Sequence, residues 1–72
     1  MIIQRFTKGN RSLELHRLLG CETDDDGRLV EMEYWECRIN DGRTLSFADC
    51  AIAVMFIQQN LWTEVADFDT DL

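Results

Sequence analysis

The chain lacks the residue patterns on which most small-protein chemistry depends. It has 72 residues, no proline, one histidine and four glycines, which are scattered among turns rather than gathered in a phosphate-binding loop. The single histidine, His16, has no serine and acid near it at a recognisable spacing, so neither a catalytic triad nor a histidine-rich zinc set is predicted. These absences predict a protein that is not an enzyme and that holds no metal or cofactor.

Cysteine is also scarce. Cys21, Cys37 and Cys50 are odd in number and widely spaced. This pattern fits neither a complete disulfide framework nor a CxxC metal or redox pair. We expect reduced, mostly buried thiols, which are typical of a cytoplasmic protein.

No apolar run is long enough to cross a membrane. The longest, residues 50–57, has eight residues, whereas a spanning helix needs about 20. The first residues, MIIQRF, reach a polar side chain after two isoleucines and do not resemble a signal peptide. We therefore expect a soluble, cytoplasmic protein that makes no membrane contact.

The chain is short and acidic. Its 72 residues form a single expected domain, 1–72, below the size at which one core comfortably stabilises a fold. Fourteen acidic residues oppose seven basic ones, for a formal charge of −7, and thirteen of the acids lie in 21–72. Such a chain should avoid nucleic acid and be attracted to basic surfaces.

The clearest secondary-structure signal is a β-hairpin around 28–47. Residues 28–39 alternate in side-chain type as in a strand, and residues 43–47 form a second extended run. Asn40-Asp41-Gly42 between them tolerates the positive φ of tight hairpin turns. The length of the first strand predicts a bulge near Trp35 or Glu36.

Two N-terminal segments are also assigned. Residues 2–7 are expected to form a short strand that ends at a turn. Residues 12–19 are ambiguous, because Leu13 and Leu15 alternate as in a strand, whereas Leu15 and Leu18 share one face of a helix. A short helix is favoured there, with a strand as the alternative.

A C-terminal helix is expected over about 47–60. Ser46 is the predicted N-cap, with Asp49 returning the hydrogen bond. The eight consecutive apolar residues cover every direction around this helix. Its outer side must therefore be covered by residues 12–19, by the C-terminal tail or by a second subunit, because each large apolar side chain left in water forgoes about 1.5–3 kcal/mol.

These elements predict the α+β class. The expected architecture is a small antiparallel sheet of three or four strands packed by one C-terminal helix, with the short second helix at 12–19. Residues 64–72 form an acidic tail whose order is left open.

Residues 22–33, ETDDDGRLVEME, carry acids at the first, third, fifth and twelfth positions and glycine at the sixth. The segment resembles the calcium loop of the EF-hand family, which implies a calcium-binding module as one alternative function. It departs from the family at Glu22, where aspartate is usual, and in being followed by a strand-like run rather than a helix.

The favoured function comes from the pattern of carboxylates. Alternate residues of an extended chain stand on one face about 6.6 Å apart. DNA phosphates repeat every ~3.4 Å of helix axis along one strand, and they are further apart through space because the strand winds, so the two spacings are comparable. The acids that we expect to bind a partner fall in one loop, one strand and the tail: Asp24, Asp25, Asp26, Glu31, Glu33, Asp67, Asp69 and Asp71. Their alternation is also typical of the wet face of any half-buried strand.

In size and charge the chain resembles the small acidic inhibitors that phages make against nucleic-acid enzymes, such as uracil-DNA glycosylase inhibitor and anti-CRISPR proteins. This resemblance implies a viral, DNA-mimicking inhibitor of a basic, nucleic-acid-binding protein. A different hypothesis is a homodimeric structural or regulatory subunit that uses Ile52, Met55 and Phe56 on the apolar helix as its interface.

Overall fold

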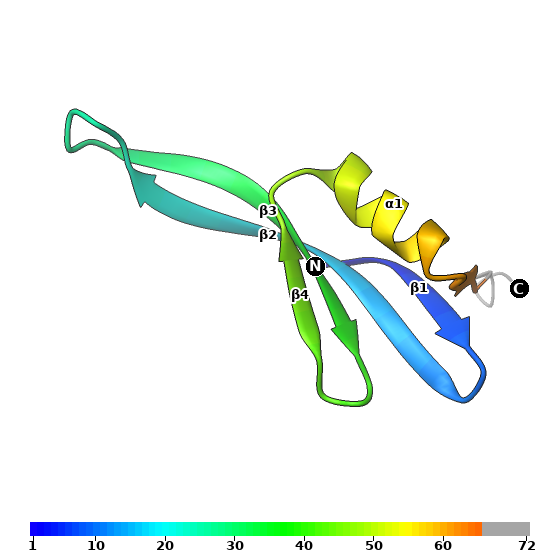
Figure 1. The fold of residues 1–72 in the computed structure, drawn as a ribbon. Helices are drawn as coiled ribbons and strands as arrows, with labels where there is room; N and C mark the ends of the chain where they lie inside the picture. The colour runs from blue at the N-terminus through cyan, green and yellow to red at the C-terminus, as the bar shows by residue number, and fades with distance from the viewer. Residues whose placement is uncertain (66–72) are drawn as a thin grey trace, which may run out of the picture.

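The computed structural model describes residues 1–65, which form five strands and one helix. All strand pairs are antiparallel, in the order β4-β3-β2-β1-β5 (Figure 1). The elements are β1 (Ile2–Lys8), β2 (Arg11–Thr23), β3 (Leu29–Ile39), β4 (Thr44–Phe47), α1 (Cys50–Gln59) and β5 (Thr63–Glu64). The α+β class fits this fold, but the sheet has five strands rather than three or four, and β5 follows the helix, which is therefore not C-terminal.

The predicted helix at 12–19 is wrong, because these residues belong to the central strand β2. β2 pairs with β1 on one side and with β3 on the other, so its backbone groups are satisfied by two neighbours. Leu13 and Leu15 point from it into the core. The helix propensity of leucine, glutamate and arginine is a weak preference that this two-sided pairing overrides.

The hairpin predicted around 28–47 is present as β3 and β4. The backbone N–H of Gly42 donates to the carbonyl of Ile39 at 3.0 Å, and Gly42 has a φ of 99°, which favours glycine. β3 carries no bulge at Trp35, because its register with both β2 and β4 is continuous there. The one register shift recorded for the β1–β2 pair lies in β1, between Ile2 and Gln4.

The helix begins later than the sequence predicted. Ser46 pairs with Glu36 in β4, so it is extended backbone and cannot be the N-cap. The N-cap is Asp49, whose carboxylate accepts a hydrogen bond from the backbone N–H of Ala51 at 2.8 Å. Pairing with β3 keeps the chain extended through Phe47, and the helix begins at Cys50, three residues later than predicted.

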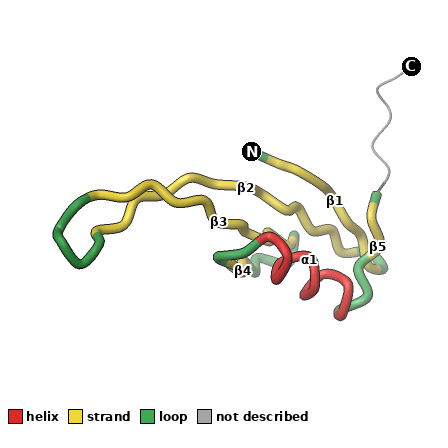
Figure 2. Tube along the Cα trace, turned by 90° about the horizontal axis from the view of Figure 1, so that it is seen from above, coloured by secondary structure: helices red, strands yellow, loops and turns green. Residues whose placement is uncertain are grey.

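Figure 2 shows α1 lying along one face of the sheet. The core lies between that face and α1. Phe56 packs against it, with its ring centroid 5.5 Å from that of Phe47. Of the three residues suggested for a dimer contact, Phe56 is thus partly buried within the molecule, whereas Ile52 and Met55 are each 52% exposed on α1. The buried apolar residues are Leu13, Leu15, Cys37, Ile39, Ala53 and Ile57.

The three cysteines are free, and only Cys37 is buried. Burial raises the pKa of its thiol to about 11, which keeps it protonated at neutral pH. Cys21 is exposed and Cys50 is half-buried, so the expectation of mostly buried thiols holds for one of the three. The helix α1, the one helix in residues 1–65, is too short to cross a membrane.

Leu13→Ala should unfold the protein or come close to it. The side chain is fully buried (0% exposed), and such truncations cost about 2–5 kcal/mol. A core of this size supplies only about 3–5 kcal/mol in all. Urea denaturation followed by circular dichroism measures the loss.

The matched control is Leu19→Ala in the same strand, where the leucine is 67% exposed. Its free energy of unfolding should stay within about 0.5 kcal/mol of the wild type. Equal losses in the two variants would contradict the position of the core.

Candidate functional site

β2 and β3 run far beyond their neighbours and project as a two-stranded arm (Figure 1). β1 pairs with β2 only as far as His16, and the chain's first residue bonds Arg17. β4 ends opposite Trp35. Residues 18–34, which we call the arm, therefore pair only with each other within the described chain. The arm lies along the longest dimension of the molecule, 47 Å.

The tip of the arm is a tight turn built by Asp24. Its Oδ1 accepts hydrogen bonds from the backbone N–H groups of Asp26 and Arg28, each at 2.9 Å. Gly27 has a φ of 81°, a conformation that favours glycine. Residues 24–27 thus form a turn between β2 and β3, and the carboxylate of Asp24 is engaged in building it.

The arm and the rest of the molecule differ in charge. Residues 18–34 carry six acidic residues and one arginine, whereas residues 1–17 and 35–65 together carry five acidic and six basic residues. The negative charge of residues 1–65 is therefore concentrated on the arm. The six acids are Glu22, Asp24, Asp25, Asp26, Glu31 and Glu33.

Three of the five acids of residues 1–65 that lie outside the arm are beside basic side chains. Glu14 lies 2.9 Å from the Nε2 atom of His16 and 3.7 Å from Arg5. The hydrogen bond with His16 is the main reason that the pKa of Glu14 is lowered, and Arg5 adds to the effect. His16 is 8% exposed. Its side chain hydrogen-bonds to Glu14 and, within residues 1–65, to no serine, threonine or cysteine side chain.

Two more acids outside the arm have arginine partners. Glu36 lies 2.7 Å from Arg38, and Asp41 lies 3.0 Å from Arg43. The backbone N–H of Arg43 donates to Asp41, and this bond is the main reason that the pKa of Asp41 is lowered.

Within the arm, only Glu33 has an ion pair in the described structure, with Arg17 at 3.5 Å. Both side chains are nearly half exposed, so the pair only partly offsets the charge of Glu33. The remaining arm acids have no cationic partner among residues 1–65. They are Glu22, Asp24, Asp25, Asp26 and Glu31.

The hairpin brings together five of the acids that the sequence suggested for partner binding. Asp24, Asp25 and Asp26 form the tip, and Glu31 and Glu33 follow on β3. The other three lie outside the described residues, namely Asp67, Asp69 and Asp71.

The structure adds one acid that the sequence analysis missed. Glu22 pairs with Val30 in the same arm. The turn at 24–27 places Glu22 beside β3. With a helix favoured at 12–19, the sequence analysis did not expect a strand that pairs with β3 at Glu22.

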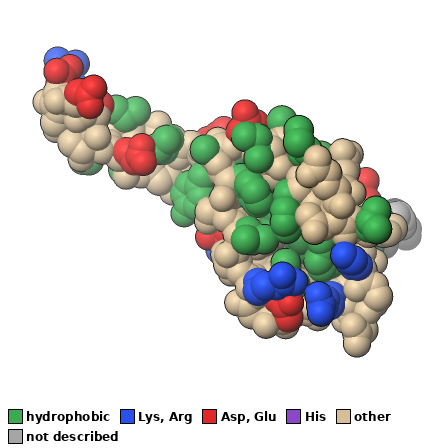
Figure 3. All heavy atoms as spheres, in the orientation of Figure 1, with side chains coloured by type: hydrophobic (Ala, Val, Ile, Leu, Met, Phe, Trp, Pro, Cys, Tyr) green, Lys and Arg blue, Asp and Glu red, His purple; other side chains and the backbone are tan. Residues whose placement is uncertain are grey.

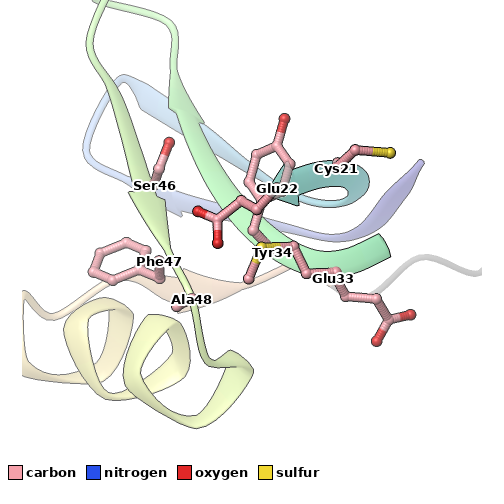
Figure 4. Close-up of a pocket in the computed structure, with 9 residues that line it drawn as sticks. Cys21, Glu22, Glu33, Tyr34, Ser46, Phe47 and Ala48 are labelled. Carbon is pink, nitrogen blue, oxygen red and sulfur yellow. The ribbon is translucent and has the colours of Figure 1, made fainter. Parts of the chain in front are cut away.

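The acids occupy both faces of the arm. Alternation along β3 places Glu31 and Glu33 on the face that carries α1 further along the sheet, and Glu22 on the opposite face. Figure 4 shows the carboxylate of Glu22 pointing into a hollow, whereas that of Glu33 points away from it. The hollow has a volume of about 460 Å³ and lies where the arm leaves β4, beside Tyr34 and Phe47.

This geometry does not match the EF-hand resemblance. An EF-hand loop joins two helices, whereas residues 22–33 form the end of β2, a turn and the start of β3. Glu22 and Glu33, the first and twelfth positions, point to opposite faces (Figure 4). Within residues 1–65, no three histidine, cysteine or acidic side chains are arranged to hold a metal ion.

The arm also exposes large apolar side chains. Leu29 is 76% exposed, and the others on the arm are Leu19, Val30 and Met32. Figure 3 shows hydrophobic side chains interspersed with acidic ones along the arm. Gly20 is covered by Tyr34, because a Cβ at this glycine would lie 3.2 Å from the Tyr34 ring. The arm is thus an extended surface that mixes apolar and acidic groups.

Comparisons with protein-family models, with curated proteins and with solved structures found no match to this chain.

The arm should open more readily than the rest of the sheet. An isolated two-stranded hairpin is marginally stable in water, and the arm has no third strand or helix among the described residues. The amide N–H groups of Leu18, Gly20 and Met32 should therefore exchange with deuterium at least ~10-fold faster than that of Leu15 in the three-stranded part of the sheet. Hydrogen exchange followed by NMR measures this difference, and equal protection would contradict a free arm.

Proposed function

We propose that this protein is a non-enzymatic, cytoplasmic binding protein, an inhibitor that presents the arm to a basic surface of a nucleic-acid-handling protein. The observation that carries the proposal is the concentration of carboxylates on a projecting arm, where five of the six acids have no cationic partner among residues 1–65. Elsewhere in residues 1–65, three of the five acids lie beside basic side chains. A complementary basic surface would gain both attraction and faster association.

The apolar side chains of the arm support the same role. Covering Leu19, Leu29 and Val30 in a complex would remove apolar surface from water, which is favourable by about 25 cal/mol per Å². A surface that is both acidic and apolar favours a protein partner over a small metal cation, because a protein surface supplies basic and apolar groups together and a metal cation does not.

A nucleic-acid-handling partner is favoured by the geometry of the charges. Glu31 and Glu33 alternate on one strand face, so their spacing of about 6.6 Å is comparable with that of phosphates along a DNA strand. The chain's acidity and size also resemble those of phage inhibitors such as uracil-DNA glycosylase inhibitor and anti-CRISPR proteins. The protein itself should not bind nucleic acid, since its net charge is negative.

Neutralising the arm should weaken the complex. In the triple variant Asp25→Asn, Asp26→Asn and Glu31→Gln, the partner captured from a lysate and identified by mass spectrometry should bind at least ~10-fold more weakly. Its affinity should also depend less steeply on salt, because fewer charges are screened. Titration at several salt concentrations measures both effects.

The control adds the same charge away from the arm. Thr44→Lys, Gln58→Lys and Gln59→Lys change exposed residues of β4 and α1 and give the same formal net charge as the arm variant. This control should retain wild-type affinity. Unchanged binding by the arm variant, or equal weakening by both, would reject the arm as the binding surface.

A second candidate function is a homodimeric structural or regulatory subunit. It is favoured by Ile52 and Met55, which are each 52% exposed on a helix without charged residues. Sedimentation at micromolar concentration should then show a dimer that Ile52→Ser with Met55→Ser converts to a monomer. A wild-type protein that is strictly monomeric would contradict this candidate.

A further inference from the structure

The outer edge of β3 carries free backbone groups along the arm. The N–H of Ile39 donates towards β4, to Arg43, whereas the N–H of Asn40 donates towards β2, to Ser12. Because backbone direction alternates along a strand, the odd-numbered residues of β3 face the β4 side. Beyond the end of β4, the backbone groups of Leu29, Glu31 and Glu33 therefore face outwards with no strand beside them in residues 1–65.

The residues with free backbone groups also carry the carboxylates. Glu31 and Glu33 stand side by side on one face of this edge. A strand paired with them would place alternate side chains about 5.5 Å from each glutamate, measured between Cα atoms. Backbone pairing and charge pairing would thus use the same two residues.

We propose that this edge of the arm binds an extended segment of the partner as an additional antiparallel strand, with lysine or arginine at alternate positions opposite Glu31 and Glu33. The inference rests on the proposed function and specifies how the basic partner is recognised. Addition of a strand to an exposed sheet edge is a known mode of peptide recognition, in which backbone bonds give affinity and alternate side chains give specificity.

Charge decides between a foreign segment and a second copy of this chain. Antiparallel pairing of two β3 edges would place the glutamates of one copy beside those of the other, and like charges in cross-strand positions are destabilising. The outer edge of β2 offers Leu19, Cys21 and Thr23, which carry no carboxylate. The β3 edge is therefore the one that selects a basic segment.

The end of β4 leaves space for the added strand. β4 ends at Phe47, and after Asp49 the chain continues as α1. No strand of residues 1–65 therefore continues β4 along the edge of β3. The hollow beside Tyr34 and Phe47 lies at this point (Figure 4). The segment would continue the line of β4 towards the tip of the arm.

The test uses a synthetic ten-residue peptide that alternates lysine and valine. In the proposed register the lysine N–H groups face β3 and the valine N–H groups face away. N-methylation of the lysine amides should weaken binding at least ~10-fold, because several hydrogen bonds are lost together. N-methylation of the valine amides, with the same charge and added volume, should leave binding unchanged. Isothermal titration measures the affinities.

Two further measurements locate the peptide. The amide protons of Leu29, Glu31 and Glu33 should gain protection from exchange when the unmethylated peptide binds. Glu31→Gln with Glu33→Gln should weaken the peptide several-fold, whereas the control Glu22→Gln, on the opposite face of the arm, should not.

The outcomes separate this inference from the proposed function. Equal binding of both N-methylated peptides, or no binding of the unmethylated peptide, would overturn strand addition, while the effect of the neutralised arm on the captured partner would still stand. Loss of binding with the valine-methylated peptide alone would overturn the antiparallel register. If the captured partner binds the neutralised arm variant as tightly as the wild type, the proposed function is rejected, whether or not the peptides bind.

Discussion

The unbroken pairing of β2 with β3 is the constraint on which the rest of this structure depends. At one end it joins Leu13 to Ile39 in the buried core, and at the other it joins Thr23 to Leu29 next to the tip of the arm. β1, β4 and α1 cover only the core end. The same ladder therefore supplies both the stable part of the molecule and the exposed surface, and the arm is held out by a strand pair anchored in the core.

Much of the fold was predictable where local chemistry and tertiary pairing agree. Asn40-Asp41-Gly42 placed the β3–β4 turn correctly, because its backbone preferences match that turn. Residues 12–19 were assigned wrongly, since their leucines fit both periods and only the pairing with two neighbours decides between them. β5, with two residues, is too short to leave any periodic signal.

The candidate site was predictable in its residue types and less so in its shape. Asp24 to Asp26 and Glu31 stood out as acids in the sequence. How far the arm projects depends on where the pairing of β1 and β4 with the long hairpin ends. The sequence of the arm itself does not predict these end points. The Arg17 partner of Glu33 was likewise hidden, because Arg17 had been assigned to a helix rather than to the strand beside it.

Charge is also distributed unevenly along the long axis. Lys8 and Arg11 flank the β1–β2 turn, and Figure 1 places this turn away from the tip of the arm. Residues 1–65 thus have an electric dipole with its negative pole at the tip. In the field of a positively charged surface, such a molecule is rotated tip-first while still in solution. Its orientation at first contact would then be selected by long-range forces, before any short-range fit is tried.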